Sequence, residues 1–191
     1  MSRTAVTSAP ISPVLAERWS PRAFDANTDI DPTLLTAALE AARWAPSANN
    51  SQPWRFIVGT RGSDTFRRIH AHLGGWNGAW ADNAAALVVN VVDSQLGDGQ
   101  QAIWHEYDLG QAVAQFVAQI HHDGLHAHQM GGVDRDALLT EFGLDGDRYR
   151  VMSVTAVGVI GHPDQLPDPM RERELAPRAR KSLDEIVLVR D

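Results

Sequence analysis

The chain contains no cysteine. This absence excludes disulfide bonds, thiolate zinc sites, iron–sulfur clusters and a cysteine nucleophile. No apolar run reaches the 18 residues of a membrane-spanning helix, and the first eleven residues lack the charged-then-apolar order of a secretory signal. Lysine and arginine number 17 against 24 aspartates and glutamates, so the net charge of −7 favours neither nucleic acid nor an anionic membrane as partner. We therefore expect a cytoplasmic protein.

Several motifs that carry common chemistry are also missing. The sequence has no G-x-G-x-x-G or G-x-x-x-x-G-K-[ST] phosphate loop, no G-x-S-x-G hydrolase motif and no H-E-x-x-H zinc motif. Four histidines lie between His121 and His128, but Gly124 ends the preceding helix between them, so we expect no metal site. A nucleotide-like ligand would need side chains to hold its phosphate.

The length and composition of the chain are those of an ordinary globular domain. The 191 residues are 43% hydrophobic and 21% charged, without repeats or low-complexity blocks, which predicts one domain over residues 1–191. Residues 1–11 are small and polar, and we expect them to form a flexible tail. Residues 163–181 are proline-rich and charged, and we expect them to lie outside the core.

Helices and strands alternate without a regular βαβ order, which favours an α+β layered fold over a doubly wound one. Cap residues and apolar spacing predict helices over 13–18, 32–45, 63–73, 103–122 and 135–142. Continuous apolar runs predict strands over 54–58, 84–92 and 153–160, with a further strand at Ile186–Val189.

The first segment that could carry chemistry is R-W-S-P-R-A-F-D at residues 18–25. Its two arginines flank a serine where a helix ends, and a guanidinium is a planar fork of donors that matches phosphate oxygens in pairs. Two solvated surface arginines would fit the pattern equally well.

The second segment is A-P-S-A-N-N-S-Q-P-W-R-F at residues 45–56. Its amides offer paired donors and acceptors that can read the edge of a heterocycle. A turn cluster is the alternative, because asparagine, serine and proline are typical of turns. The two prolines and the tryptophan favour a rigid, functional segment.

Two later segments are weaker by themselves. Gln129-Met130-Gly131-Gly132 places adjacent glycines before a helix cap, where a ligand can approach backbone N–H groups. Residues 177–183 hold three cations within four positions, which could be a solvated run or part of a phosphate site.

Taken together and in this order, these segments resemble the FMN-dependent nitroreductase family. The resemblance rests on residues 18–25, 45–56, 129–132 and R-A-R-K-S-L-D-E-I-V at 178–187. It implies a layered α+β fold with a central, mostly antiparallel sheet flanked by helices. It also implies a homodimer with FMN at the interface and a C-terminal strand that could be exchanged between subunits.

By position, the resemblance implies that Arg18, Ser20, Arg178 and Arg180 hold the FMN phosphate and nearby ribityl oxygens. Arg22 would lie near the pyrimidine edge, where a cation favours the reduced flavin.

The resemblance assigns the flavin ring to other segments. Asn50 would hydrogen-bond the ring, and Pro46, Ser47 and Ala48 would press on it from the partner subunit. Gly131 and Gly132 would aim N–H groups at its N5/O4 side, with Asn77 as a looser candidate. The remaining expected cofactor contacts are Trp19, Gln52 and Met130.

The helix predicted over 103–122 offers a physical reason for a dimer. Gly110, Ala112 and Ala114 would permit close helix approach, with Trp104 and Phe116 as anchors. A buried central helix fits the same pattern.

The activity implied is transfer of hydride and electrons from NAD(P)H, through FMN, to nitroaromatics, quinones or similar small planar electron-poor acceptors by a ping-pong mechanism. The alternative is a non-catalytic FMN store or sensor. The segment between Val92 and Ile103 is too short for a lid over the flavin, which favours catalysis. Specialised family chemistry, such as flavin cleavage, dehalogenation or azoline oxidation, has no segment of its own here.

Overall fold

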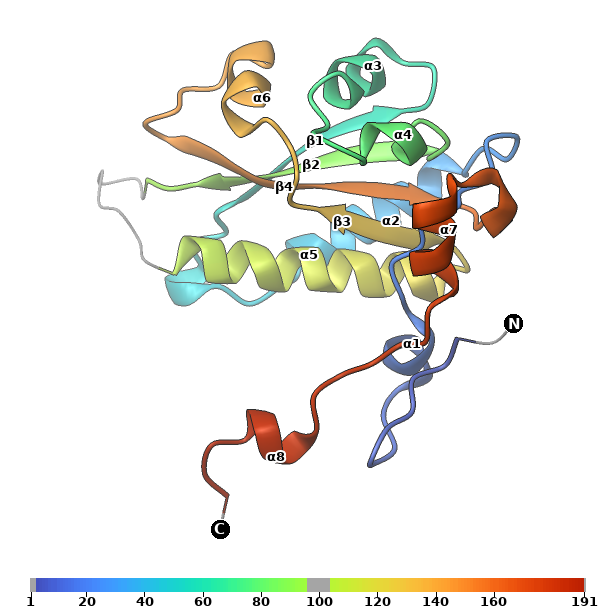
Figure 1. The fold of residues 1–191 in the computed structure, drawn as a ribbon. Coiled ribbons are helices and arrows are strands. Elements are labelled where there is room, and N and C mark those ends of the chain that lie inside the picture. The colour runs from blue at the N-terminus through green and yellow to red at the C-terminus, as the bar shows by residue number, and fades with distance from the viewer. Residues whose placement is uncertain (1–2, 96–103, 191) are drawn as a thin grey trace.

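The computed structural model describes residues 3–95 and 104–190 (Figure 1). Its strands are β1 (Trp54–Thr60), β2 (Ala86–Asp93), β3 (His126–Met130) and β4 (Tyr149–Gly158). Its α-helices are α1 (Pro13–Glu17), α2 (Pro32–Arg43), α3 (Asp64–His70), α4 (Gly78–Ala81), α5 (His105–His122), α6 (Arg135–Glu141), α7 (Asp168–Leu175) and α8 (Leu183–Ile186). Two 3₁₀ turns, η1 (Ala48–Asn50) and η2 (Pro163–Gln165), complete the described elements.

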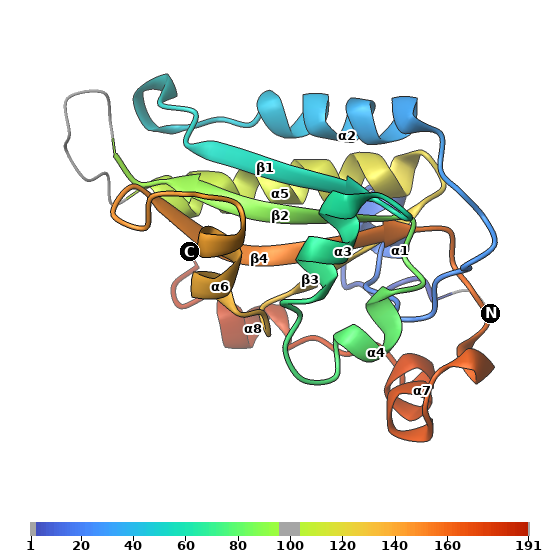
Figure 2. The same ribbon diagram turned by 90° about the horizontal axis from the view of Figure 1, so that it is seen from above.

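The four strands form one antiparallel sheet in the order β1-β2-β4-β3. Helices α2 and α5 cover one face, and α3, α4 and α6 cover the other (Figures 1 and 2). Every residue of β2 is buried, as its continuous apolar run predicts. The one side-chain amide in this strand, that of Asn90, donates from Nδ2 to the hydroxyls of Ser153 and Thr155 on β4. Its buried NH₂ group is therefore hydrogen-bonded. The predicted α+β layered fold is confirmed.

Local signals set several helix ends. Asp31, Ser63 and Asp134 each accept a hydrogen bond from a backbone N–H in the first turn of the following helix. After α5, Gly124 has a φ of 81°, the left-handed conformation that favours glycine at a helix C-terminus. The predicted boundaries of these helices are therefore close to the observed ones.

The strand predictions need three corrections. Strand β3 was not predicted, because its histidines and glutamine at the sheet edge look like loop residues. Strand β4 begins at Tyr149, four residues before the predicted start. At the C-terminus, Ile186 ends α8 and residues 187–190 pair with no strand of the described chain, so the strand predicted at Ile186–Val189 does not form within it.

The two polar end segments are also more ordered than their compositions suggest. The predicted flexible tail is wrong for Arg3 and Ala5: the carbonyl of Arg3 accepts from Arg178, and the N–H of Ala5 donates to Ala16. In the segment expected to lie outside the core, α7 buries Met170 and Glu174. Backbone partners far away in sequence produce this order.

Helix α5 divides the residues predicted for a dimer contact between two faces. Ala112 and Phe116 are buried against the chain's own sheet, so the prediction that they face a partner is wrong. Trp104, Gly110 and Ala114 lie on the exposed side. Ile103, which belongs to the predicted helix, lies outside the described residues, as does most of the segment predicted to be too short for a lid.

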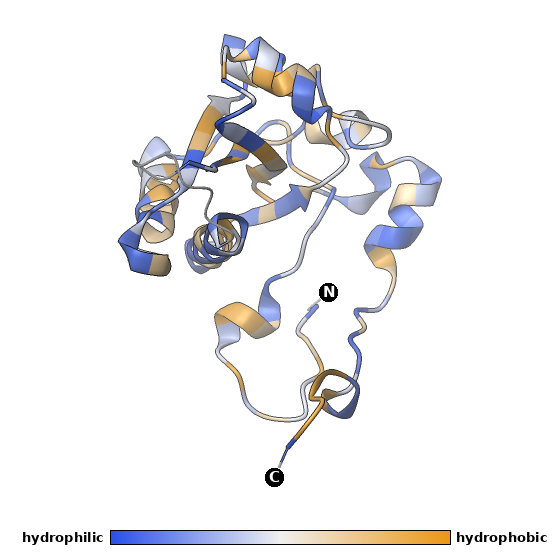
Figure 3. Cartoon of the chain, turned by 90° about the vertical axis from the view of Figure 1, so that its left-hand side faces the viewer, coloured by the Kyte–Doolittle hydropathy of each residue, from blue (hydrophilic) through white to orange (hydrophobic). Residues whose placement is uncertain are grey.

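The C-terminal end projects away from the body, and Figure 3 shows its apolar colouring. Its large side chains Leu183, Ile186, Leu188 and Val189 are all exposed. Within residues 3–95 and 104–190, no helix combines the length and apolar character needed to cross a bilayer.

Candidate functional site

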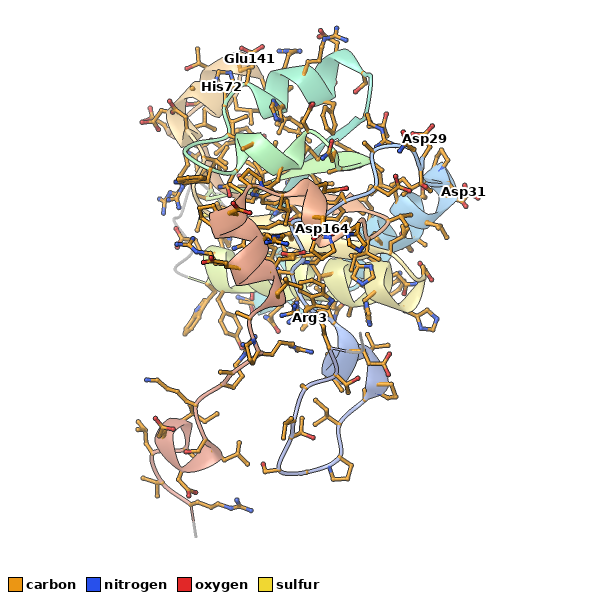
Figure 4. All side chains as sticks on the ribbon, turned by 45° about the vertical axis from the view of Figure 1, so that its right-hand side comes forward. Arg3, Asp29, Asp31, His72, Glu141 and Asp164 are labelled. Carbon is orange, nitrogen blue, oxygen red and sulfur yellow. The ribbon has the colours of Figure 1, made fainter. Side chains whose placement is uncertain are left out.

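Arginines from both ends of the chain meet around one cavity of about 260 Å³ below the end of the sheet. Arg18 and Arg22 come from the segment after α1, and Arg178 and Arg180 from the segment after α7. Figure 4 labels a fifth, Arg3, where the two terminal segments meet the body. The full lining is Arg3, Arg18, Trp19, Ser20, Arg22, Arg173, Ala176, Pro177, Arg178, Ala179 and Arg180.

The segment at residues 18–25 is fixed to the sheet by its second half. Phe24 is fully buried, stacks on Trp80 and forms a β-bridge with Ile160 after β4. Gly161 makes this approach possible, because a Cβ there would lie 2.7 Å from the backbone carbon of Phe24. Arg18 and Arg22 therefore extend from a backbone that the core holds in place.

A buried carboxylate shapes the same turn. Glu174, 1% exposed, accepts the backbone N–H groups of Arg22 at 3.0 Å and Ala23 at 3.2 Å, and the Arg22 guanidinium lies 3.9 Å away. No pattern in the sequence indicates this role, because a glutamate in a charged helix is normally solvated. The Glu174 carboxylate carries a single negative charge, which does not balance the arginines around the cavity. The cavity therefore stays strongly positive.

The guanidinium groups repel one another. Burial and the neighbouring Arg180 lower the pKa of Arg18. Burial, followed by Arg18, Arg180 and Arg3, lowers the pKa of Arg178. Arginine nevertheless stays protonated in proteins, so both guanidinium groups carry their charge at a cost that comes first from burial and then from mutual repulsion, and a bound anion would relieve it.

Arg178 has a structural role that the sequence analysis did not predict. Its Nη1 donates to the carbonyls of Arg3 and Ala16, and its Nη2 donates to the carbonyl of Arg18 at 2.9 Å. Three of the five donors of this guanidinium are thus used to tie the two terminal segments together. Arg178 therefore helps to hold the cavity together, and its predicted contact with a phosphate, like those of Arg18 and Arg180, stays a prediction.

The two glycines lie directly after β3 and pack against the loop before α4. The carbonyl of Gly132 accepts from Asn77 Nδ2 and from the N–H of Gly74, both at 3.0 Å, while Gly131 has open space where a Cβ would lie. Met130 is 2% exposed and its side chain packs in the core, so the predicted cofactor contact of this residue, which stays a prediction, would have to come from its backbone.

Strand β3 also connects these glycines to the arginine segment. His128 Nδ1 bonds to the carbonyl of Pro21 at 2.9 Å, and its ring lies on Trp80. Gly131 follows three residues later, about 10 Å along a strand at 3.3 Å per residue. The cavity and the glycine loop could therefore contact the two ends of one elongated ligand.

The amide segment lies away from the arginine cavity, and several contacts of its own hold its backbone. Asn49, Asn50 and Gln52 all have left-handed φ values, from 49° to 56°. The N–H of Ala48 donates to Asp108 near the N-terminus of α5, and Ser47 Oγ accepts from the N–H of Gln52. Together with the flanking Pro46, these contacts hold Asn50 in one conformation.

Helix α5 separates this amide segment from the arginine cavity. His121, near the C-terminus of α5, lines a second cavity that shares Arg3 and Trp19 with the first. From Asp108 to His121 the helix rises about 20 Å at 1.5 Å per residue. Within one chain, the structure therefore does not bring Asn50 to the arginines.

The second cavity, of about 340 Å³, contains two histidines of the sequence cluster. The rings of His121 and His126 meet edge-on with centroids 5.6 Å apart, and burial followed by His121 lowers the pKa of His126. Among the described residues, no group of three histidine, aspartate or glutamate side chains could hold a metal ion.

The arginine cavity suits a phosphate group. Guanidinium forks pair with phosphate oxygens. In the part of the chain that the structure describes, the buried Nε of Arg3 has no hydrogen-bond partner. An unpaired buried donor beside several cations is the feature that an anionic ligand would satisfy.

Comparisons with known proteins point to one family. The model of the nitroreductase family matches residues 15–76. A Streptomyces coelicolor protein named as an NADH dehydrogenase/NAD(P)H nitroreductase is 28% identical over 158 residues, covering 72% of this chain and 76% of the relative. A crystal structure described as an oxidoreductase containing FMN has a TM-score of 0.90 and 32% identity, covering 97% of this chain and 94% of that one. An Exiguobacterium sibiricum nitroreductase solved with FMN shares the fold, with a TM-score of 0.75, 19% identity and coverage of 96% and 98%.

The burial of His128 predicts a pH-dependent stability. Burial lowers the pKa of His128 from 6.5 to about 4. Below pH 6.5 the unfolded chain therefore binds a proton that the folded chain does not, so stability is complete above pH 6.5 and falls as the pH drops toward 4. At pH 5 we expect His128 to contribute a loss of about 2 kcal/mol relative to pH 7.

Urea unfolding at pH 7 and pH 5 measures this loss. The variant His128→Asn, which can still donate an amide hydrogen to Pro21, should lose about 2 kcal/mol less than the wild type between the two pH values. The exposed control His162→Asn should lose as much as the wild type. An equal loss in all three proteins would show that His128 does not titrate in this way.

Proposed function

The chain belongs to the nitroreductase family, and from this premise we propose that it is an FMN-dependent oxidoreductase that passes electrons from NAD(P)H to nitroaromatic, quinone or similar electron-poor acceptors. The convergence of arginines from both ends of the chain on one cavity carries this proposal. The phosphate of FMN is a dianion with the charge and oxygen geometry that such a cavity suits.

Arg18, Arg180 and Ser20 would hold this phosphate. They line the cavity, and Arg178 keeps their two segments together through the carbonyls of Ala16 and Arg18. Trp19 lies in the same lining and would limit the entry of water around the phosphate. These residues bind and orient the cofactor, and no acid, base or nucleophile from the chain is required.

Arg22 and the glycine loop would contact the ring end. Bound FMN supplies hydride acceptance and donation at one open face, so NAD(P)H and the acceptor would use that face in turn, as in ping-pong kinetics. Arg22, with its backbone held by Glu174, would favour negative charge on the pyrimidine end by a few kcal/mol before desolvation, at an effective dielectric constant near 20. The N–H groups of Gly131 and Gly132 would bind polar atoms of the ring edge.

A second subunit would supply the amide segment. Within one chain, Asn50 and the arginines lie at opposite ends of α5, so a shared site needs a symmetric partner. The exposed side of α5 and the exposed apolar residues of the C-terminal end support such a dimer, because large apolar patches normally mark contact surfaces. Residues 186–189 would then add to the partner's sheet.

The visible spectrum of the purified protein tests the proposed activity. We expect the absorption of oxidised flavin, its loss when NAD(P)H is added without oxygen, and its return when a quinone is added. Steady-state NAD(P)H oxidation should depend on the quinone.

Two other results would contradict the proposal. A colourless protein that takes up no added FMN would remove the cofactor assignment. A yellow protein that oxidises no NAD(P)H with any quinone or nitroaromatic acceptor would instead support the FMN store or sensor.

Subunit complementation tests the shared site. Arg18→Ala should weaken FMN binding about tenfold to a hundredfold, from the loss of one charge-assisted contact, and Asn50→Ala should reduce turnover. If each site takes Arg18 from one subunit and Asn50 from the other, a mixed dimer has one intact site, and random mixing of the two variants restores about a quarter of the wild-type sites.

The measurement is NAD(P)H oxidation after the two variants are unfolded together and refolded, at limiting FMN. Each variant treated alone is the control and should keep only its own reduced activity. No recovery in a mixture proved to contain the mixed dimer would place Asn50 and Arg18 in separate sites.

A further inference from the structure

Arg3 is the least expected residue of the cavity, because it belongs to the polar N-terminal end of the chain. Its Nη1 donates to the carbonyl of Glu174, and its Nη2 donates to the carbonyl of Ala176 at 2.7 Å. Arg178 returns a bond to the carbonyl of Arg3. Residues 3–12, which we call the N-terminal strap, are thus fastened to the segment that carries Arg178 and Arg180.

The orientation of the Arg3 guanidinium is fixed by Trp19. The guanidinium carbon lies 4.1 Å from the centroid of the indole ring, in a cation–π contact. The plane of the fork is therefore held by the indole and by two carbonyls before any ligand arrives. A preorganised donor of this kind loses little conformational entropy on binding.

Two features indicate a binding role beyond fastening the strap. The Nε of Arg3 is buried and, among residues 3–95 and 104–190, has no hydrogen-bond partner. Burial and the neighbouring arginines lower the pKa of Arg178, and the charge of Arg3 contributes to this shift. Arg3 is therefore placed where its charge is repelled by that of Arg178. A purely structural contact would gain from a neutral donor, which would avoid that repulsion.

We propose that Arg3 is a further phosphate-recognition residue, carried by the N-terminal strap, that makes the site selective for a phosphorylated flavin over the same flavin without its phosphate. The inference rests on the proposed function, because it assigns a residue to the phosphate end of the same site. Arg3 is the one strap residue in the described lining of the cavity, and it supplies charge and donors that the predicted set of arginines lacks.

Flavin affinity measured with two probes, FMN and riboflavin, tests the proposal. The binding constants come from quenching of flavin fluorescence in the full-length protein, so no turnover is needed. In Arg3→Gln we expect FMN to bind about tenfold to a hundredfold more weakly, with riboflavin changed less than about twofold. The matched control is Arg135→Gln on exposed α6, which should change neither constant.

The conservative variant separates recognition from fastening. Arg3→Lys keeps the charge but loses the planar fork, so it should recover part of the FMN affinity without changing riboflavin binding. If Arg3→Gln does not fold, the Lys variant takes its place, with a smaller FMN-selective loss expected.

Distinct results would overturn the two proposals. If Arg3→Gln weakens FMN and riboflavin equally, or weakens neither, Arg3 only fastens the strap and the inference fails while the FMN site stands. Where Arg3→Lys replaces a Gln variant that does not fold, an unchanged ratio of the FMN and riboflavin binding constants would have the same meaning. Failure of the wild type to bind FMN would remove the proposed function and this inference with it.

Discussion

Like-charge repulsion in one small cavity is the constraint on which the site depends. Several guanidinium groups share a space of about 260 Å³, and Glu174, which also binds two backbone N–H groups, supplies little compensation. The chain holds this arrangement with contacts made elsewhere: Phe24 in the core, and Arg178 bonded to three carbonyls. The clustered cations destabilise the folded chain, and these contacts offset that cost, which is typical of a site prepared for an anion.

The two ends of the molecule have different tasks. Near the C-terminus of α5 the terminal segments build the cationic cavity, and near its N-terminus Asp108 holds the amide segment in left-handed conformations. The length of α5 separates the two in one chain. The apolar side chains of the C-terminal end are exposed as well, and the proposed dimer would bring the two ends of α5 into one site.

Much of the fold could be predicted because its signals are local. Asp31 and Ser63 cap their helices with their own side chains, and the apolar run of β2 is buried on both faces. Strand β3 could not be predicted in this way, since His126 and His128 carry no apolar alternation. The burial of Glu174 and the position of Arg3 depend on partners more than 150 residues away, which no local pattern contains.

The charge state of a bound phosphate tests the central claim most directly. The phosphate dianion of free FMN takes up its first proton near pH 6, whereas a cavity of clustered arginines should hold the dianion. The test is a ³¹P NMR titration of the FMN-loaded protein between pH 7.5 and pH 5, which runs from about 1.5 units above to about 1 unit below that pKa. We predict that the resonance of the bound phosphate stays at its dianion position. A resonance that titrates near pH 6, as in free FMN, would contradict the account.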